Sequence, residues 1–282
     1  MAEFKFGRPP VGELTQGVTL QYFHWLHSPD WIRVWDDRVK MESFSSAVTT
    51  FYGSDFARRQ ASDGTVFVSG LVNSLYTVVD NSFAMKISDL SLSMKRISYF
   101  FQVDDSEGCA RYILRGDDQI TLTSGWDIFF GGRGDDVLWG KGQNDELSGD
   151  SGNDSLFGGR GDDVLTGGRG RDELTGDAGA DHFRFRNARE GDADKIMDFA
   201  VGEDKIVVNA AFFDLPEGAL DDDAFHLGKV AEDAEDRFLY DAATGRLLFD
   251  ADGTGDGQAV LLARLMNRPA LQASDFLVGL FG

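Results

Sequence analysis

Gly158-Gly159-Arg160-Gly161-Asp162-Asp163-Val164-Leu165-Thr166 is one copy of a nine-residue unit that repeats without insertion or deletion over residues 113–184. The sixth position is aspartate in every copy: Asp118, Asp127, Asp136, Asp145, Asp154, Asp163, Asp172 and Asp181. The eighth position is always apolar: Ile120, Phe129, Leu138, Leu147, Leu156, Leu165, Leu174 and Phe183. A fixed short period of this kind predicts a stacked solenoid in which each copy adds one layer.

The residue types within the unit indicate its chemistry. Glycine at positions 1, 2 and 4 lets the backbone take positive φ, so that the carbonyls of a tight turn can converge. The aspartate at position 6 adds a hard anionic oxygen, and a cage made only of oxygen atoms suits Ca²⁺ better than Zn²⁺ or Mg²⁺. The apolar residue at position 8 is expected to point inward from a very short strand.

These residues resemble the RTX calcium-binding nonapeptide repeat. The resemblance implies a parallel β-roll in which each Ca²⁺ lies between two turns 18 residues apart, with about four to six ions in all. One implied site combines Gly132, Gly134 and Asp136 with Gly149, Ser151 and Asp154, and another combines Lys141, Gln143 and Asp145 with Gly158, Arg160 and Asp163. The implied calcium ligands over the whole repeat are Asp118, Gly125, Asp127, Gly131, Gly132, Arg133, Gly134, Asp136, Gly140, Lys141, Gly142, Gln143, Asp145, Gly149, Asp150, Ser151, Gly152, Asp154, Gly158, Gly159, Arg160, Gly161, Asp163, Gly167, Arg169, Asp172, Gly176, Ala178 and Asp181. The first two copies depart from the pattern, with Ile113-Leu114 and Leu122-Thr123 where Gly-Gly is expected.

The chain is predicted to be all-β, with the β-roll at 113–184 between two other parts. Residues 1–112 read as a β-rich domain with strands near 18–25, 65–79 (interrupted near Asn73) and 85–101, arranged as a sandwich or as a sheet packed on one end of the roll. Residues 185–282 are expected to form a β capping region, because an open last coil would expose unpaired strand edges. This part resembles the segment that caps the roll in serralysin-type proteases. A hairpin is expected over 237–250 and a third strand over 259–265. The apolar end at 277–282 is either an export signal or a strand that closes the last sheet.

Composition excludes several functions. The formal net charge of -21 argues against a nucleic-acid partner, because phosphate binding requires a basic face. No apolar run approaches the ~20 residues of a transmembrane helix. Cys109 is the single cysteine, so no disulfide can form within the chain, and calcium is expected to take over that stabilising role. The first residues lack the apolar segment of a Sec signal peptide. The RTX resemblance instead implies a secreted, extracellular protein that leaves through the type I secretion apparatus.

Enzyme signatures are absent from the sequence. Neither an H-E-x-x-H nor a G-x-S-x-G motif occurs, and Gly149-Asp150-Ser151-Gly152 is explained by its place in the repeat. His24 and His27 lack further metal ligands nearby, and the neighbouring tryptophans Trp25, Trp31 and Trp35 favour packing over glycan stacking. Residues 250–256 resemble the opening of an EF-hand loop but lack its final glutamate, which leaves a polar turn or a weak calcium site.

The sequence thus predicts a secreted calcium-binding protein whose roll folds outside the cell and supports an N-terminal module that binds a surface glycan or a partner cell. The alternative is an extracellular enzyme or toxin with its active part in residues 1–112.

Overall fold

The computed structural model describes residues 114–122 and 124–281 in full and, before them, the backbone of six strands. The chain divides into two compact units, Met1–Val137 and Leu138–Gly282. The expected strand at 18–25, the histidine pair, Trp25, Trp35 and Cys109 lie outside the described residues, as does the side chain of Trp31.

The first unit contains an antiparallel meander in which each strand pairs with the next along the chain. Its strands are β1 (Glu3–Lys5), β2 (Trp31–Val34), β3 (Arg38–Glu42), β4 (Ala47–Gln60), β5 (Val66–Val79), β6 (Ser82–Ser93) and β7 (Gln119–Thr121). The register of β5 against β6 shifts between Val72 and Ser74, where the sequence predicts an interruption. The last strand of the meander, β7, belongs to the first nine-residue copy and pairs antiparallel with β6. The unit also contains β8 (Ile128–Arg133).

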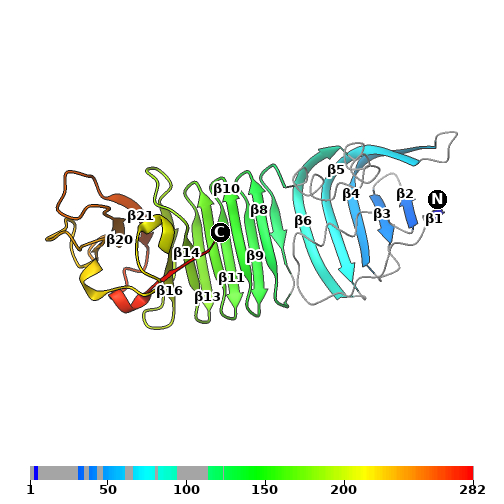
Figure 1. The fold of residues 1–282 in the computed structure, drawn as a ribbon. Coiled ribbons are helices and arrows are strands. Elements are labelled where there is room, and N and C mark those ends of the chain that lie inside the picture. The colour runs from blue at the N-terminus through cyan, green and yellow to red at the C-terminus, as the bar shows by residue number, and fades with distance from the viewer. Residues whose placement is uncertain are drawn as a thin grey trace. The chain divides into compact units, whose positions relative to one another are not determined.

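Six regular strands of the repeat, one for each copy from the third to the eighth, form the parallel β-roll. They are β9 (Val137–Gly142), β10 (Glu146–Ser151), β11 (Ser155–Arg160), β12 (Val164–Arg169), β13 (Glu173–Ala178) and β14 (His182–Phe185). Odd and even strands form separate sheets, β9-β11-β13 and β10-β12-β14 (Figure 1). Leu147 pairs with Leu165 and Leu156 with Leu174, so strands 18 residues apart are neighbours. The predicted fold class is confirmed.

The interior of the roll is a column of single apolar side chains. All eight position-8 residues, from Ile120 to Phe183, have no exposed surface. The strict period explains this, because a strand with a fixed two-residue alternation and an unchanged register turns the same position inward in every layer. In the third to eighth copies each layer therefore buries one apolar side chain from its repeat, which is a small hydrophobic contribution for nine residues, whereas the first two copies also bury Leu114 and Leu122.

Beyond the regular repeat, two further strands continue the parallel stacking in the second unit. β15 (Asp194–Ile196) pairs with β13, and β16 (Lys205–Asn209) pairs with β14. β21 (Val260–Leu265) then pairs in parallel with β15, and β22 (Phe276–Gly279) with β16. The apolar C-terminal stretch therefore supplies a strand to this sheet, which is one of the two structures expected for it.

The remaining elements of the second unit cover the end of these sheets. The expected hairpin consists of β19 (Phe238–Asp241) and β20 (Arg246–Phe249), and β20 pairs antiparallel with β21. The other elements are α3 (Ala210–Phe213), β17 (Gly218–Ala219), η2 (Asp222–Ala224), β18 (Phe225–His226) and η3 (Ala273–Asp275). Within the part of the chain that is described, no helix has the length and apolar character needed to cross a membrane.

An aromatic cluster forms the core of this end region. Phe238 lies at its centre, with ring centroids 5.1 Å from Phe276, 5.5 Å from Phe249 and 5.7 Å from Phe213. These side chains come from β19, β22, β20 and α3, so the cluster ties the hairpin to the C-terminal strand. This core is of ordinary hydrophobic type, in contrast to the thin column inside the roll.

We expect Phe238→Ala to destabilise the protein by about 3–5 kcal/mol, because it removes a fully buried aromatic side chain from the centre of the cluster. Denaturant unfolding in the presence of calcium measures the change. Phe212→Ala is the matched control, since Phe212 is 48% exposed, and it should cost far less. Equal losses for the two variants would contradict this description of the core.

Candidate calcium site

The turns of the roll place positions 2 and 4 of the repeat in the left-handed region of backbone space. In the third to eighth copies every one of these positions has positive φ: Gly132, Lys141, Asp150, Gly159, Gly168 and Asp177 at position 2, and Gly134, Gln143, Gly152, Gly161, Gly170 and Gly179 at position 4. Four of these residues are not glycine, although left-handed backbone costs an ordinary residue about 1–2 kcal/mol. The turn conformation is therefore imposed by the stacking and is not a consequence of glycine alone.

Position 1 requires glycine for a different reason, because the space beside its Cα is too small for a side chain. The position-1 glycines of the described copies are not among the residues with positive φ. A Cβ added at Gly140 would lie 2.5 Å from Asp145 Oδ2 and 2.6 Å from Gly158 O. At Gly158 it would meet Asp163 Oδ2 and lie 2.9 Å from Gly176 O. Carboxylate and carbonyl oxygens from two turns thus converge on a space that any side chain would fill.

The position-6 aspartates form a hydrogen-bonded ladder along the roll. One carboxylate oxygen, Oδ1, accepts the backbone N–H of the aspartate 18 residues earlier. The donor and acceptor pairs are Asp118 N to Asp136 (2.8 Å), Asp145 N to Asp163 (2.7 Å), Asp154 N to Asp172 (2.8 Å) and Asp163 N to Asp181 (2.9 Å). All eight aspartates are at most 2% exposed. The ladder holds each carboxylate in one orientation, with its second oxygen turned toward the position-1 glycine.

The second oxygen of Asp163 shows what the site requires. Asp163 Oδ2 is buried and accepts no hydrogen bond from any described residue. A buried carboxylate oxygen without a donor is costly unless a cation balances it. The described residues contain no group of three or more His, Cys, Asp or Glu side chains that could hold a metal. The space at Gly158 is bordered by Asp163 Oδ2 and by the backbone carbonyl oxygen of Gly176. Such an oxygen set, with carboxylates from two turns, fits Ca²⁺.

Burial disfavours the charged form of these aspartates when no cation is bound. Burial raises the pKa of the Asp163 carboxyl from 3.8 to about 6. Burial also raises the pKa of Asp181 to about 7, and the nearby charges of Asp204 and Asp163 add to the increase. These groups therefore favour the folded state most below pH 3.8, and this contribution is lost as the pH rises through 6 to 7. At neutral pH the metal-free ladder works against folding.

Three aspartates beyond residue 184 extend and end the ladder, and sequence reasoning did not assign them. Asp194 Oδ1 accepts the N–H of Asp172 (3.1 Å), and Asp204 Oδ1 accepts the N–H of Asp181 (3.0 Å). The Asp-x-apolar pattern shared by 194–196 and 204–206 was the available signal, but the spacings of 22 and 23 residues conceal it. Asp204 Oδ2 accepts the N–H of Ala200 (2.7 Å), so this last carboxylate is satisfied by the protein itself.

Asp198 ends the ladder in the same manner. Its two carboxylate oxygens accept the N–H groups of Gly176 (3.0 Å) and Asp177 (2.8 Å). At the end of the roll, both oxygens of the Asp198 carboxylate are thus bound by backbone N–H groups, whereas within the repeat the second oxygen of Asp163 faces a backbone carbonyl oxygen.

The residues that resemble an EF-hand also accept hydrogen bonds from the backbone. Asp250 Oδ1 accepts from Asp252 N (3.2 Å), and Asp252 Oδ2 accepts from Gly257 N (3.0 Å).

The sheet order places residues of the second implied site on neighbouring strands, because Lys141 lies on β9 and Gly158 and Arg160 lie on the adjacent β11. A Cβ added at Gly159 would lie 2.5 Å from Lys141 O, and one added at Gly161 would lie 2.5 Å from Gln143 O, so the two turns approach each other closely. In the pairs β10–β12 and β11–β13 the partners are 18 residues apart. The carbonyl of Ala178 also accepts the N–H of Gly161 (2.8 Å), which fixes the same turn-to-turn spacing. The assignment of individual ligands over residues 118–181 stays a prediction.

Comparison with known proteins assigns the repeat to a class. The family model of the RTX calcium-binding nonapeptide repeat (4 copies) matches residues 114–138, 121–156 and 148–183. The chain therefore carries RTX calcium-binding repeats, arranged as a β-roll. The likeness of the C-terminal region to serralysin-type proteins stays a prediction, because these matches do not reach it.

A solved structure with similarity to the chain is the solution structure of the AlgE6R3 subunit from the Azotobacter vinelandii mannuronan C5-epimerase. It is 25% identical, covers 58% of this chain and 78% of its own, and has a TM-score of 0.29. No curated protein matches the chain.

We expect Gly158→Ala to weaken calcium binding and lower the thermal midpoint in calcium, because its Cβ would fill the space between Asp163 Oδ2 and Gly176 O. The matched control is Gly142→Ala, at position 3 of the repeat. A Cβ there meets nothing nearer than Arg160 O at 3.6 Å. Calcium titration calorimetry and thermal melts compare the two, and equal behaviour would contradict the proposed geometry.

We expect lowering the pH from about 9 to about 5 to favour folding of the metal-free chain, because the carboxyls of Asp163 and Asp181 have raised pKa values in the folded roll, about 6 and about 7, and bind protons there more readily than in the unfolded chain. Far-ultraviolet circular dichroism of the chelated chain over this pH range measures the gain in β signal. A β signal that does not change with pH would contradict the raised pKa values.

Proposed function

We propose that this chain is a secreted protein whose β-roll folds when it binds calcium outside the cell. The observation that carries the proposal is the column of buried position-6 aspartates, in which Asp163 Oδ2 faces carbonyl oxygen and has no hydrogen-bond donor. Without a cation these carboxylates repel one another in a buried environment. With a cation, the same groups become ligands that hold successive turns together.

The thin core of the roll makes the cation decisive. Each nine-residue layer buries one apolar position-8 side chain, which contributes about 1.5–3 kcal/mol. Ordering nine backbone residues costs about 1–2 kcal/mol each, so this apolar burial is far too small to order the turn. Because the folded roll assembles the site, binding energy and folding energy belong to one equilibrium.

We further propose about four to six ions, bound between turns 18 residues apart. Hydrogen bonds join aspartates with this separation, as in the pairs Asp118–Asp136 and Asp163–Asp181, which supports ions bound between turns at this spacing. Export through the type I secretion apparatus follows from the RTX repeats as an inference. A chain that is unfolded at the low calcium of the cytosol and folds at millimolar calcium outside suits this route.

A calcium titration of the chelated full-length chain, followed by far-ultraviolet circular dichroism, tests the proposal. We expect β signal to appear cooperatively with calcium, and Asp163→Asn to shift the midpoint about tenfold or more to higher calcium, because it removes charge from a carboxylate shared by two turns. Asp162→Asn is the matched control. Asp162 is exposed, and its Oδ1 accepts the N–H of Ala180, which asparagine can still do. A full β signal without calcium would refute the proposal.

Residues 1–112 are proposed as a separate module that the roll supports, with 185–282 as the cap. The meander of long strands β4 to β6 offers a broad sheet of the kind that binds a surface glycan or a partner cell. Binding of the calcium-loaded full chain to a glycan array or to cells supports this role. Hydrolysis of a polysaccharide or dye release from liposomes would instead support an enzyme or toxin.

A further inference from the structure

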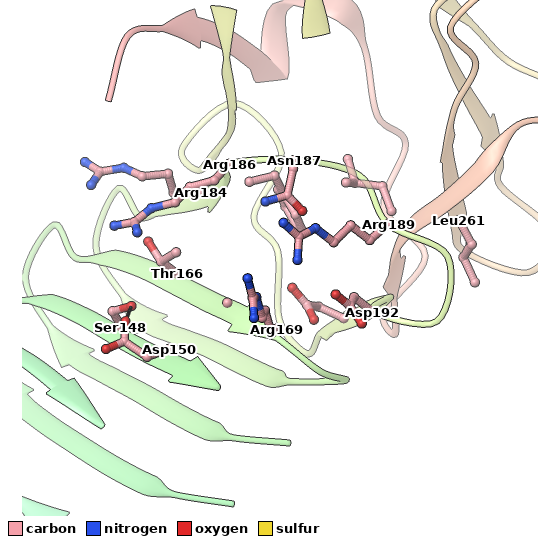
Figure 2. A pocket seen from close by; sticks show the side chains of 14 residues that line it. Ser148, Asp150, Thr166, Arg169, Arg184, Arg186, Asn187, Arg189, Asp192 and Leu261 are labelled. Carbon is pink, nitrogen blue, oxygen red and sulfur yellow. Dashed lines mark hydrogen bonds between the residues drawn. The ribbon is translucent and has the colours of Figure 1, made fainter. Parts of the chain in front are cut away.

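A cavity of about 240 Å³ lies in the second unit, beside the sheet of even-numbered repeat strands. We call it the arginine cavity after four of its lining residues, Arg169, Arg184, Arg186 and Arg189. They come from β12, from β14 and from the loop that follows β14, as Figure 2 shows. The first two are repeat residues, whereas the other two belong to the irregular connection to β15.

The charge of this cavity contrasts with that of the unit, because four arginines and the three aspartates Asp150, Asp192 and Asp194 line it, a formal charge of 4 - 3 = +1. Residues 138–282 contain 14 lysines and arginines and 30 aspartates and glutamates, a net charge of 14 - 30 = -16. Four of the 14 basic residues line this one cavity. An anion approaching an acidic protein would be attracted to such a place and repelled elsewhere.

Three of the arginines are available to a ligand. Arg169, Arg186 and Arg189 are exposed and form no ion pair with any residue that the structure describes. Figure 2 shows the side chains of Arg169 and Arg189 directed toward the same space, beside Asp192. The planar guanidinium group binds carboxylate and phosphate oxygens with two parallel hydrogen bonds, so these residue types favour an oxyanion.

Arg184 is held in place by its neighbours. Its Nη1 donates to Glu146 Oε1 at 2.6 Å, and its guanidinium carbon lies 4.9 Å from the centre of the Phe281 ring. Arg184 Nε is buried and has no acceptor among the described residues. A buried donor without an acceptor costs about 1–3 kcal/mol, which a ligand oxygen would recover.

The other polar lining groups indicate that the anion also carries hydroxyl groups. Ser148, Thr166 and Asn187 supply neutral donors and acceptors, and Ser148 Oγ donates to Asp150 Oδ1 at 2.8 Å. Asp150 and Asp192 would repel a ligand that presents only negative oxygens, but they can accept hydrogen bonds from hydroxyl groups. The volume lies below the range of about 300–1,000 Å³ usual for drug-sized ligands, which suits a single sugar ring.

We propose that the arginine cavity binds one anionic sugar unit, a hydroxylated ring that carries a carboxylate or a phosphate. Arg169, Arg186 and Arg189 bind the oxyanion, and Arg184 Nε donates a further hydrogen bond. The hydroxyl groups of the ring interact with Asp150, Asp192 and Asn187. This site borders the calcium ladder, because Asp150 and Arg169 are also among the implied calcium ligands and Asp194, which extends the ladder, lines the cavity as well. Its ligand is of opposite charge to calcium.

Titration calorimetry of the calcium-loaded full chain tests the site with four probes: glucuronate, glucose 6-phosphate, glucose and sulfate. We expect saturable binding of glucuronate or glucose 6-phosphate, and which of them binds distinguishes a carboxylate from a phosphate ligand. Glucose lacks the charge and sulfate lacks the ring, so both should bind at least about tenfold more weakly. Binding of neither charged sugar, or equal binding of glucose or sulfate, overturns the proposal.

The double variant Arg186→Ala/Arg189→Ala should weaken binding of the charged sugar about tenfold or more, because it removes two of the guanidinium groups. The matched control is Arg246→Ala/Arg264→Ala, which removes the same charge from two exposed arginines that do not line the cavity. Both variants should keep the calcium-dependent circular dichroism signal, which separates a failure of this site from a failure of calcium-driven folding. Equal sugar affinity in the two variants overturns the assignment.

Discussion

The hydrogen bond between one aspartate carboxylate and the backbone N–H of the aspartate 18 residues earlier is the interaction on which the roll depends. In the pair formed by Asp145 and Asp163 it fixes the spacing of turns and the orientation of the carboxylate at once. The second oxygen of Asp163 is left facing carbonyl oxygen, without a donor. The hydrogen bond that fixes the spacing of the turns therefore also leaves a buried carboxylate oxygen that a cation has to balance.

The way the ladder ends follows from this demand. Asp204 and Asp198 lie where the regular repeat stops, and their carboxylates are bound by N–H groups of Ala200, Gly176 and Asp177. Backbone donors thus balance the negative charge where no further turn follows in register. Beyond this point the aromatic cluster around Phe238 supplies hydrophobic stabilisation that the roll lacks, so the second unit combines a metal-dependent part with a conventional core.

The two kinds of site use the acidic character of the chain in opposite ways. Inside the roll, buried aspartates concentrate negative charge for a cation. In the arginine cavity, basic residues from β12, β14 and the following loop gather in a unit that is otherwise strongly acidic. Neighbouring turns of a solenoid offer separate surfaces at short distance, so one scaffold can support both a cation ladder and an anion cavity.

The sequence alone determined the parts of this protein that follow from a strict period: the parallel roll, its inward column from Ile120 to Phe183 and the buried aspartates. Because the period is fixed, the strands of the roll can pair in only one register. The position of a residue in the repeat therefore predicts whether its side chain is buried in the folded roll. Tertiary structure alone decided that position 1 needs glycine for space at Gly158, that Asp194 and Asp204 extend the ladder, and that Arg169 and Arg189 line one cavity. These features join residues across irregular spacings, where contacts between distant segments, and not the local pattern, set the position of each side chain.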